Sequence, residues 1–238
     1  MRLWQFSTKA GPGIARDAPK TGLALLADVV VRNWWELIQL NLMVILFSLP
    51  IVTLPAALIA ATRICALMLD DRNVYLGRDF LEAFRRKFWR ATVVGYGAFG
   101  VVAVAAYAAF SFVQAARDNL FLALPLTISA STAVFMMIAA SYAFVLLAMR
   151  DQPLRVLLKR AMLGALARPL PALAALAFVA LLWVLHVVFY PVSIFMPAVI
   201  NFSFGMLAVT FGVHQAAARL LALEESAGNG EAYAEGSA

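Results

Sequence analysis

The chain has 238 residues, of which 64% are hydrophobic and 13% are charged, and its mean hydropathy is +0.87. A soluble domain has roughly 45–50% apolar and about 25% charged residues, so a soluble core could not bury this excess. The single cysteine, Cys65, excludes an intrachain disulfide and a cysteine metal site. Composition therefore predicts an all-α, polytopic helical membrane protein.

The two ends of the chain differ from its middle. Residues 1–22 mix basic residues with glycine and proline, and no apolar stretch of signal-peptide length follows them directly, so we expect a retained cytoplasmic arm. Residues 23–219 are expected to form a single transmembrane domain. Residues 220–238 are small and acidic, which is typical of a disordered tail.

Two prolines five residues apart interrupt an apolar stretch early in the chain. Proline removes a backbone donor and clashes with the preceding turn, so a continuous helix is disturbed there. Two arrangements are open: one long broken crossing over 37–69, or a hairpin of two short crossings. As one helix, 37–69 would measure ~50 Å, which favours the hairpin. A second proline pair lies near the other end of the chain. The four candidate hinge residues are Pro50, Pro55, Pro191 and Pro197.

Two charged segments, at about 78–91 and 153–168, have the pattern of amphipathic helices. In the first, Phe80, Phe84 and Phe88 share one helical face, with charged residues on the opposite side. We expect both segments to lie on the cytoplasmic membrane surface, against anionic lipids. About six transmembrane segments are predicted, with five possible. They are 34–49, 55–69, 92–116, 120–149, 170–190 and 194–214.

Basic residues predict the orientation. Residues 72–90 carry six Lys or Arg and residues 150–168 carry five, whereas the turns near 118 and 192 carry one and none. Because Lys and Arg accumulate on the cytoplasmic side, both charged segments are expected inside. Six crossings then leave both termini cytoplasmic. Five crossings would export the basic amino-terminal arm, which the same rule disfavours.

The run LNLMVILFSLPIVTLPAA, followed by Gly77 to Phe80 and then by Phe84 and Phe88, resembles the YesL-like family of bacterial membrane proteins of unknown function. The resemblance is strongest over residues 37–95, and Pro55 departs from it because many relatives have glycine there. It implies an address in the bacterial inner membrane. Because such proteins are typically encoded beside carbohydrate uptake systems, it also implies a sugar transporter component as a partner. It implies no reaction and no cofactor.

Three polar residues in apolar segments, Asn41, Arg63 and Asn201, are candidates for a polar cavity. A buried arginine costs ~2.5–3.5 kcal/mol on insertion scales and commonly faces a protein or water interior. Arg63 is therefore a candidate contact for an anion or a substrate. The favoured alternative is that Arg63, about two turns from Asp70, extends its side chain to the cytoplasmic headgroups.

The first charged segment is also a candidate docking helix for a cytoplasmic partner, because its aromatic face coincides with positions that resemble the family. Its simpler interpretation is a topology signal that binds anionic lipid. Nucleic acid is not an expected partner, since the charges would lie against the membrane. The candidate docking residues are Arg78, Asp79, Phe80, Phe84 and Phe88.

Enzyme motifs such as GxSxG, HExxH and a phosphate-binding glycine loop are absent from the sequence. The two histidines, His186 and His214, are predicted on opposite sides of the membrane, so they would not share a metal. We therefore expect a non-catalytic protein without cofactors, acting as an accessory of a carbohydrate uptake system. A small-solute transporter or channel built on proline-broken helices is the first alternative, and a structural role in membrane assembly is the second.

Overall fold

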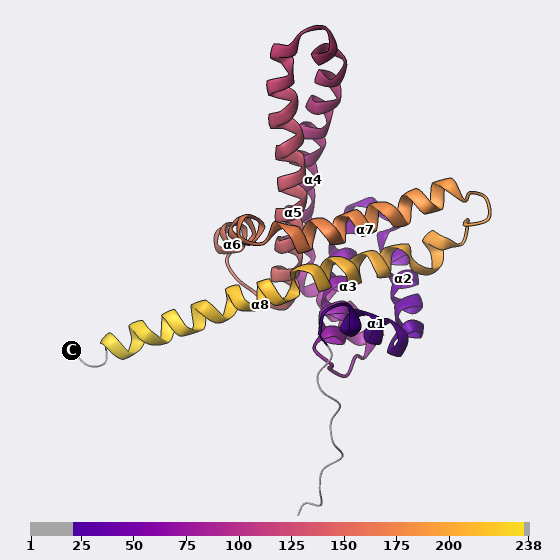
Figure 1. Ribbon diagram of the computed structural model, residues 1–238. Coiled ribbons are helices and arrows are strands. Elements are labelled where there is room, and N and C mark those ends of the chain that lie inside the picture. Colours follow the sequence, from indigo (N-terminus) through magenta and orange to yellow (C-terminus); the bar gives the residue numbers. More distant parts are fainter. Residues whose placement is uncertain (1–20, 236–238) are drawn as a thin grey trace, which may run out of the picture.

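The computed structural model describes residues 21–235, except for the side chains of residues 117, 118 and 223–235. Nearly all of the predicted amino-terminal arm therefore lies outside the described residues. The described chain forms helices joined by short turns (Figure 1). The α-helices are α1 (Leu23–Arg32), α2 (Trp34–Ser48), α3 (Leu54–Leu69), α4 (Leu76–Asp118), α5 (Ala123–Met149), α6 (Leu154–Ala167), α7 (Pro169–Val188) and α8 (Phe202–Glu235).

Five helical stretches are long and apolar enough to cross a membrane, and α1 with α2 would make a sixth if that pair, bent by 81°, is one span. The chain is thus an all-α polytopic protein, as the composition predicts. The bend follows Arg32, at Asn33, whose side-chain amide donates to the carbonyl oxygen of Val29 at 2.9 Å. The five stretches are Ile51–Leu69, Leu76–Ala116, Leu120–Met149, Pro169–Val188 and Pro197–Ala222.

The early hairpin forms at Pro50, which has an extended backbone between α2 and the short 3₁₀ segment η1 (Ile51–Thr53). The hydroxyl of Thr53 closes the turn by donating to the carbonyl oxygen of Pro50 at 2.6 Å. Pro55 lies in the first turn of α3, where a missing N–H leaves no hydrogen bond unmade. The helix therefore breaks between α2 and α3 as predicted; Pro50 makes the break, whereas Pro55 lies within α3.

One predicted surface helix is absent as a separate element. Residues 78–91 are the first part of α4, a continuous helix of 43 residues and roughly 64 Å. Neither proline nor glycine occurs from Arg78 to Val94, so nothing in the sequence ends the helix where its charged part meets its apolar part. The second predicted surface helix, 153–168, corresponds to α6.

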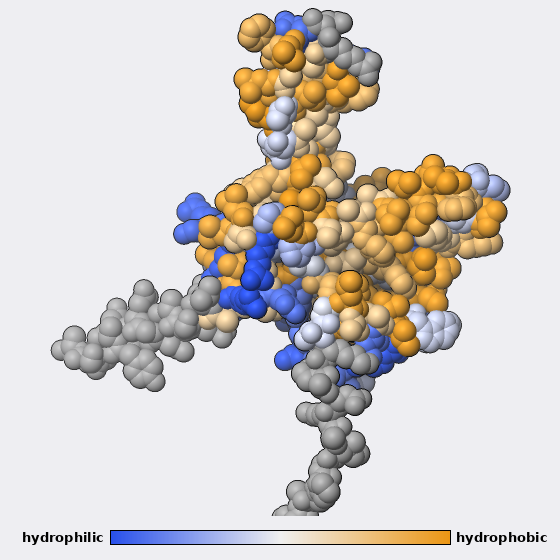
Figure 2. Space-filling view, in the orientation of Figure 1, coloured by the Kyte–Doolittle hydropathy of each residue, from blue (hydrophilic) through white to orange (hydrophobic). Residues whose placement is uncertain are grey.

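Two long hairpins project from a common base in different directions. Helices α4 and α5 form one, and α7 and α8 form the other, while α2 and α3 lie beside the base (Figure 1). Apolar residues cover both hairpins, whereas hydrophilic residues gather near the base (Figure 2). Helix α3 is buried along most of its length and contributes to both hydrophobic clusters of the interior.

Helix α8 extends to Glu235, so the backbone of residues 220–235 is helical where the acidic composition predicts disorder. Alanine, leucine and glutamate, which are frequent in this segment, have high helix propensity. The last predicted tail residues, 236–238, lie outside the described range.

Candidate functional site

Asn41 lies in the middle of α2, is fully buried, and holds the start of α8. Its amide nitrogen donates to the carbonyl oxygens of Pro197 at 2.9 Å and Ala198 at 2.6 Å. Its amide oxygen accepts from the backbone N–H groups of Phe202 at 2.9 Å and Ser203 at 3.0 Å. An asparagine side chain has two donor hydrogens and one acceptor oxygen with two lone pairs, so Asn41 is fully used.

This contact explains how the second proline break is tolerated in an apolar setting. Pro197 begins the π-helical segment η3 (Pro197–Asn201), which continues directly into α8. From another helix, Asn41 supplies one oxygen that accepts from two N–H groups at the start of α8, as an N-cap side chain does. The second predicted hinge, Pro191, lies in the turn that follows α7. Asn41 therefore has a structural role at the break and is not exposed to a cavity.

The other two residues of the predicted polar cavity do not complete one. The side chain of Asn201 is buried, and neither its amide nitrogen nor its amide oxygen has a partner among the described residues. Arg63, on α3, is half-buried. The hydrogen-bond partners of Asn41 are backbone groups on either side of Asn201, and Arg63 is not among them. Of the three, the structure brings together Asn41 and Asn201.

An apolar cavity of about 430 Å³ lies between the bases of the two hairpins. Two of its wall hydroxyls are bonded to backbone: Ser141 donates to Met137 at 3.0 Å, and Tyr96 donates to Ile51. Four cavities of the described part of the chain, this one included, have neither Asn41, Arg63 nor Asn201 in their walls.

The aromatic face of the candidate docking helix packs inside the protein. Phe80 is fully buried, and its ring centroid lies 5.3 Å from that of Phe47 on α2. Phe84 lies 5.1 Å from the same ring, and Phe88 is partly buried against the interior. An amphipathic pattern predicts a face that needs an apolar partner, and here α2 provides that partner. The stripe is consequently not available to a cytoplasmic protein.

The other two docking candidates stabilise the start of α4. A carboxylate oxygen of Asp79 accepts from the backbone N–H of Tyr75 at 2.9 Å, and the second oxygen is 3.1 Å from Nε of Arg78. The guanidinium of Arg78 also lies 4.6 Å from the centre of the Tyr75 ring. A carboxylate in the first helical turn satisfies a free N–H and complements the helix dipole.

A cluster of charged side chains at the base of the α4–α5 hairpin was not predicted. Asp151, in the turn after α5, forms ion pairs with Lys87, with Arg90 at 3.5 Å and with Arg86 at 3.6 Å. Lys87 is 2% exposed, so its ammonium group depends on this carboxylate. The sequence contained a signal for this cluster. Asp151 follows the apolar segment that ends at Met149, and the basic residues 85–90 precede the apolar segment that begins at Ala91. Both lie on the side predicted to be cytoplasmic.

The charges around Asp151 determine its ionisation. Burial alone would raise the pKa of this carboxyl, but the hydrogen bond from Lys87 and the charges of Lys87, Arg86 and Arg90 lower the pKa below its ordinary value. The next residue, Gln152, accepts a hydrogen bond on its side-chain oxygen from Arg160 and, on its backbone oxygen, one from Arg90 at 3.4 Å. We call these six residues, Arg86, Lys87, Arg90, Asp151, Gln152 and Arg160, the Asp151 cluster.

The two histidines occupy different regions. Nδ1 of His186 lies 3.2 Å from the hydroxyl oxygen of Ser193, in the turn after α7. Nε2 of His214 lies 3.3 Å from a carboxylate oxygen of Asp70 at the end of α3. No group of three His, Cys, Asp or Glu side chains that could hold a metal ion occurs among the described residues. The sequence alone did not indicate the contact between His214 and Asp70, because 144 positions separate them along the chain.

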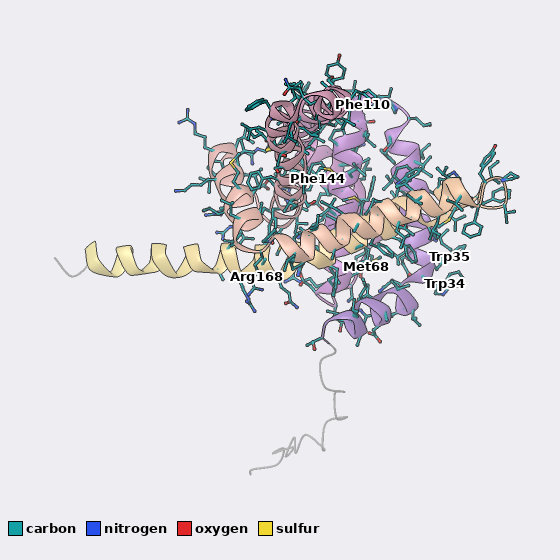
Figure 3. All side chains as sticks on the ribbon, turned by 45° about the horizontal axis from the view of Figure 1, so that its top comes forward. Trp34, Trp35, Met68, Phe110, Phe144 and Arg168 are labelled. Carbon is teal, nitrogen blue, oxygen red and sulfur yellow. The ribbon has the colours of Figure 1, made fainter. Side chains whose placement is uncertain are left out.

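Tyr142 connects the three helices on either side of the turn that contains Asp151. Tyr142 of α5 is fully buried, and its hydroxyl donates to the carbonyl oxygen of Arg168 at 2.8 Å. Arg168 lies at the start of α7 (Figure 3). A Cβ atom at Gly164 of α6 would approach the Tyr142 ring to 2.6 Å, so glycine is required there. Helices α5, α6 and α7 are thereby held together.

Comparison with known proteins finds one family model that matches part of the chain. Residues 37–109, which include most of α2, all of α3 and the greater part of α4, match the family model described as "Protein of unknown function, DUF624". No curated protein and no solved structure matches the chain. This segment includes residues 37–95, over which the sequence resembles the YesL-like family, and continues to residue 109.

Proposed function

We propose that this chain is a non-catalytic, multi-pass protein of the bacterial inner membrane that acts as an accessory subunit of a carbohydrate uptake system. The bacterial address and the carbohydrate system are supported by the resemblance of residues 37–95 to the YesL-like family. Cytoplasmic termini are supported by the basic residues at the ends of the crossings. The accessory role is supported by the shape of the molecule.

The observation that carries the accessory role is the divergence of the two apolar hairpins (Figures 1 and 2). Only 17% of the most apolar window of α4 is buried inside the protein, and the fraction is the same for α7. In a self-sufficient bundle, these helices would cover each other. Their separation leaves membrane-facing surfaces that the helices of another membrane protein can cover.

Helix α4 has a surface suited to such a contact. Gly97 and Gly100 are exposed, and a Cβ atom at either position would meet no atom within 4 Å. Small residues allow helix backbones to approach closely in membranes, where packing contributes more to association than hydrophobicity does. We propose this part of α4 as the contact with the transporter component.

A transport function of the chain itself has less support. Asn41 is fully hydrogen-bonded to backbone, and the four best-formed cavities of the described residues do not include Asn41, Arg63 or Asn201 in their walls. A structural role in membrane assembly would use the same exposed helices. The identity of the protein that is recovered with the chain distinguishes that role from the accessory role.

The test is co-purification of the tagged full-length chain from native membranes in a mild detergent. We expect a sugar transporter component to be recovered, and its amount to fall by about tenfold in the double variant Gly97→Leu and Gly100→Leu. Gly77→Leu is the matched control, because Gly77 also lies on α4 with no atom near its Cβ position but precedes the apolar part. Recovery without any transporter component, or equal recovery with the double variant, would contradict the proposal.

A further inference from the structure

The Asp151 cluster carries more positive than negative charge. Arg86, Lys87 and Arg90 all pair with the single carboxylate of Asp151. One further carboxylate, that of Glu82, is exposed and lies 3.8 Å from Arg86. Among the described residues, the cluster can therefore accept an additional anion.

Gln152 supplies a buried donor without an acceptor. Its side chain is 7% exposed, and its amide nitrogen has no partner among the described residues. The orientation of the amide is fixed, because Arg160 can only donate and the amide oxygen must face it. Leaving a buried N–H group unpaired costs free energy, which an anion with several acceptor oxygens would recover.

The cluster lies at the boundary between polar and apolar sequence. The apolar part of α4 follows Arg90 directly, and Asp151 comes two residues after the end of α5 at Met149. Trp89, beside Arg90, is 76% exposed. Tryptophan is enriched at membrane interfaces, at the depth of the lipid headgroups. The headgroup phosphates of a membrane around this tryptophan would therefore be at the level of the cluster.

We propose that the Asp151 cluster is a binding site for a phosphate group, with Arg86, Arg90 and the amide nitrogen of Gln152 as its donors. Guanidinium groups bind phosphate oxygens through two parallel hydrogen bonds, and the phosphate has acceptors left for the glutamine. The phosphate belongs either to the headgroup of an anionic phospholipid or to free inorganic phosphate. The carboxylate of Asp151 balances the positive charge of Lys87 and positions the arginines.

Two variants change the proposed donors and leave the ion pair between Lys87 and Asp151 in place. Gln152→Glu is nearly isosteric, keeps an acceptor for Arg160 and replaces the unpaired donor with a negatively charged oxygen. Arg90→Gln removes one half-exposed cation. Arg155→Gln is the matched control, because Arg155 is an exposed arginine on α6 outside the cluster. Thermal unfolding of each variant in detergent reports whether it folds.

The measurement has two arms. In the first, native mass spectrometry of the full-length protein counts the molecules of phosphatidylglycerol or of phosphatidylcholine that remain bound at equal lipid concentration. In the second, the melting temperature in a neutral detergent is followed against inorganic phosphate at constant ionic strength. We expect one arm to show binding by the wild-type chain that weakens by about tenfold in Gln152→Glu and Arg90→Gln and is unchanged in Arg155→Gln.

The results identify the source of the phosphate or overturn the site. Cluster-dependent retention of phosphatidylglycerol over phosphatidylcholine assigns a lipid, and a cluster-dependent rise in melting temperature with phosphate assigns the free anion. A folded Gln152→Glu variant that binds as the wild type does would overturn the proposal. Equal weakening by Arg155→Gln would also overturn it, since it would show attraction by overall charge. No binding in either arm would have the same consequence.

Discussion

The amide nitrogen of Asn41 lies 2.9 Å from the carbonyl oxygen of Pro197, across 156 positions of sequence. The same side chain accepts from two backbone N–H groups at the start of α8. Irregular backbone in a membrane protein is tolerated where other helices satisfy its polar groups. Helix α2, which leads into the first proline break, thus stabilises the second.

Replacing Asn41 with leucine should destabilise the fold. Asn41→Leu keeps the size of the side chain but leaves two carbonyl oxygens and two N–H groups without their partner, at an expected cost of about 2 kcal/mol or more. Thermal unfolding in detergent measures the loss. Ser48→Ala is the control on the same helix, because the Ser48 hydroxyl is buried without a partner among residues 21–222 and its removal should cost little. Equal melting of Asn41→Leu and the wild type would refute the role of Asn41.

Two neighbouring glycines of α4 should respond in opposite directions. A Cβ atom at Gly95 would lie 2.5 Å from Cβ of Pro55, whereas the space around Gly97 is open. Gly95→Ala should therefore cost about 1–3 kcal/mol through overpacking against α3. Gly97→Ala should be neutral or stabilising by up to ~1 kcal/mol, because alanine favours the helix. Melting curves of the two variants in the same detergent test the difference, and equal effects would show that α3 and α4 do not meet at Gly95.

The sequence was sufficient to predict the helical class, the early hairpin and most of the apolar segments, because proline and hydropathy act locally. It was insufficient for the aromatic stripe of α4. Phe80, Phe84 and Phe88 have the same spacing whether they face a membrane surface, a partner or the rings of another helix. Only the position of Phe47 decides, and that position depends on how α2 folds back at Pro50.

The bonding of Asn41 could not be predicted from the sequence for a related reason. Asn41 and Asn201 are distant in sequence, and a polar residue in an apolar segment has the same pattern whether it lines a cavity or caps a helix. The hydrogen bonds of Asn41 depend on where the backbone of η3 and α8 lies, which the sequence does not specify locally. The Asp151 cluster, in contrast, could have been anticipated by pairing opposite charges at the ends of adjacent crossings.

Removing the carboxylate of Asp151 should be worse than removing the pair that it forms with Lys87. Asp151→Asn leaves a buried ammonium group without its counter-charge, at an expected cost of about 3 kcal/mol. The double variant Lys87→Met with Asp151→Asn should recover most of this loss. A double-mutant cycle of melting measurements gives the coupling between the two residues. Additive losses would show that the ion pair contributes nothing.

The same carboxylate predicts a pH dependence. Because the pKa of Asp151 is lowered in the folded protein, its charged form stabilises the fold fully above its ordinary value of 3.8. That stability is lost as the pH falls through the lowered pKa. Wild type should lose melting temperature more steeply than Asp151→Asn below about pH 4, and Asp151 should add no pH dependence between about pH 5 and 7. Parallel curves for the two proteins at all pH values would contradict this assignment.

The predicted orientation can be tested by labelling at two exposed positions. Cys65 is fully buried, so the wild-type chain should react little with a membrane-impermeant thiol reagent. Leu120→Cys, in the turn between α4 and α5, should be labelled in intact cells, because that turn is predicted to lie outside. Arg155→Cys, on α6, should be labelled only after permeabilisation, because its segment carries the basic residues that favour the cytoplasm. Labelling of both variants in intact cells would show that the two sites share a side and that α5 does not cross the membrane.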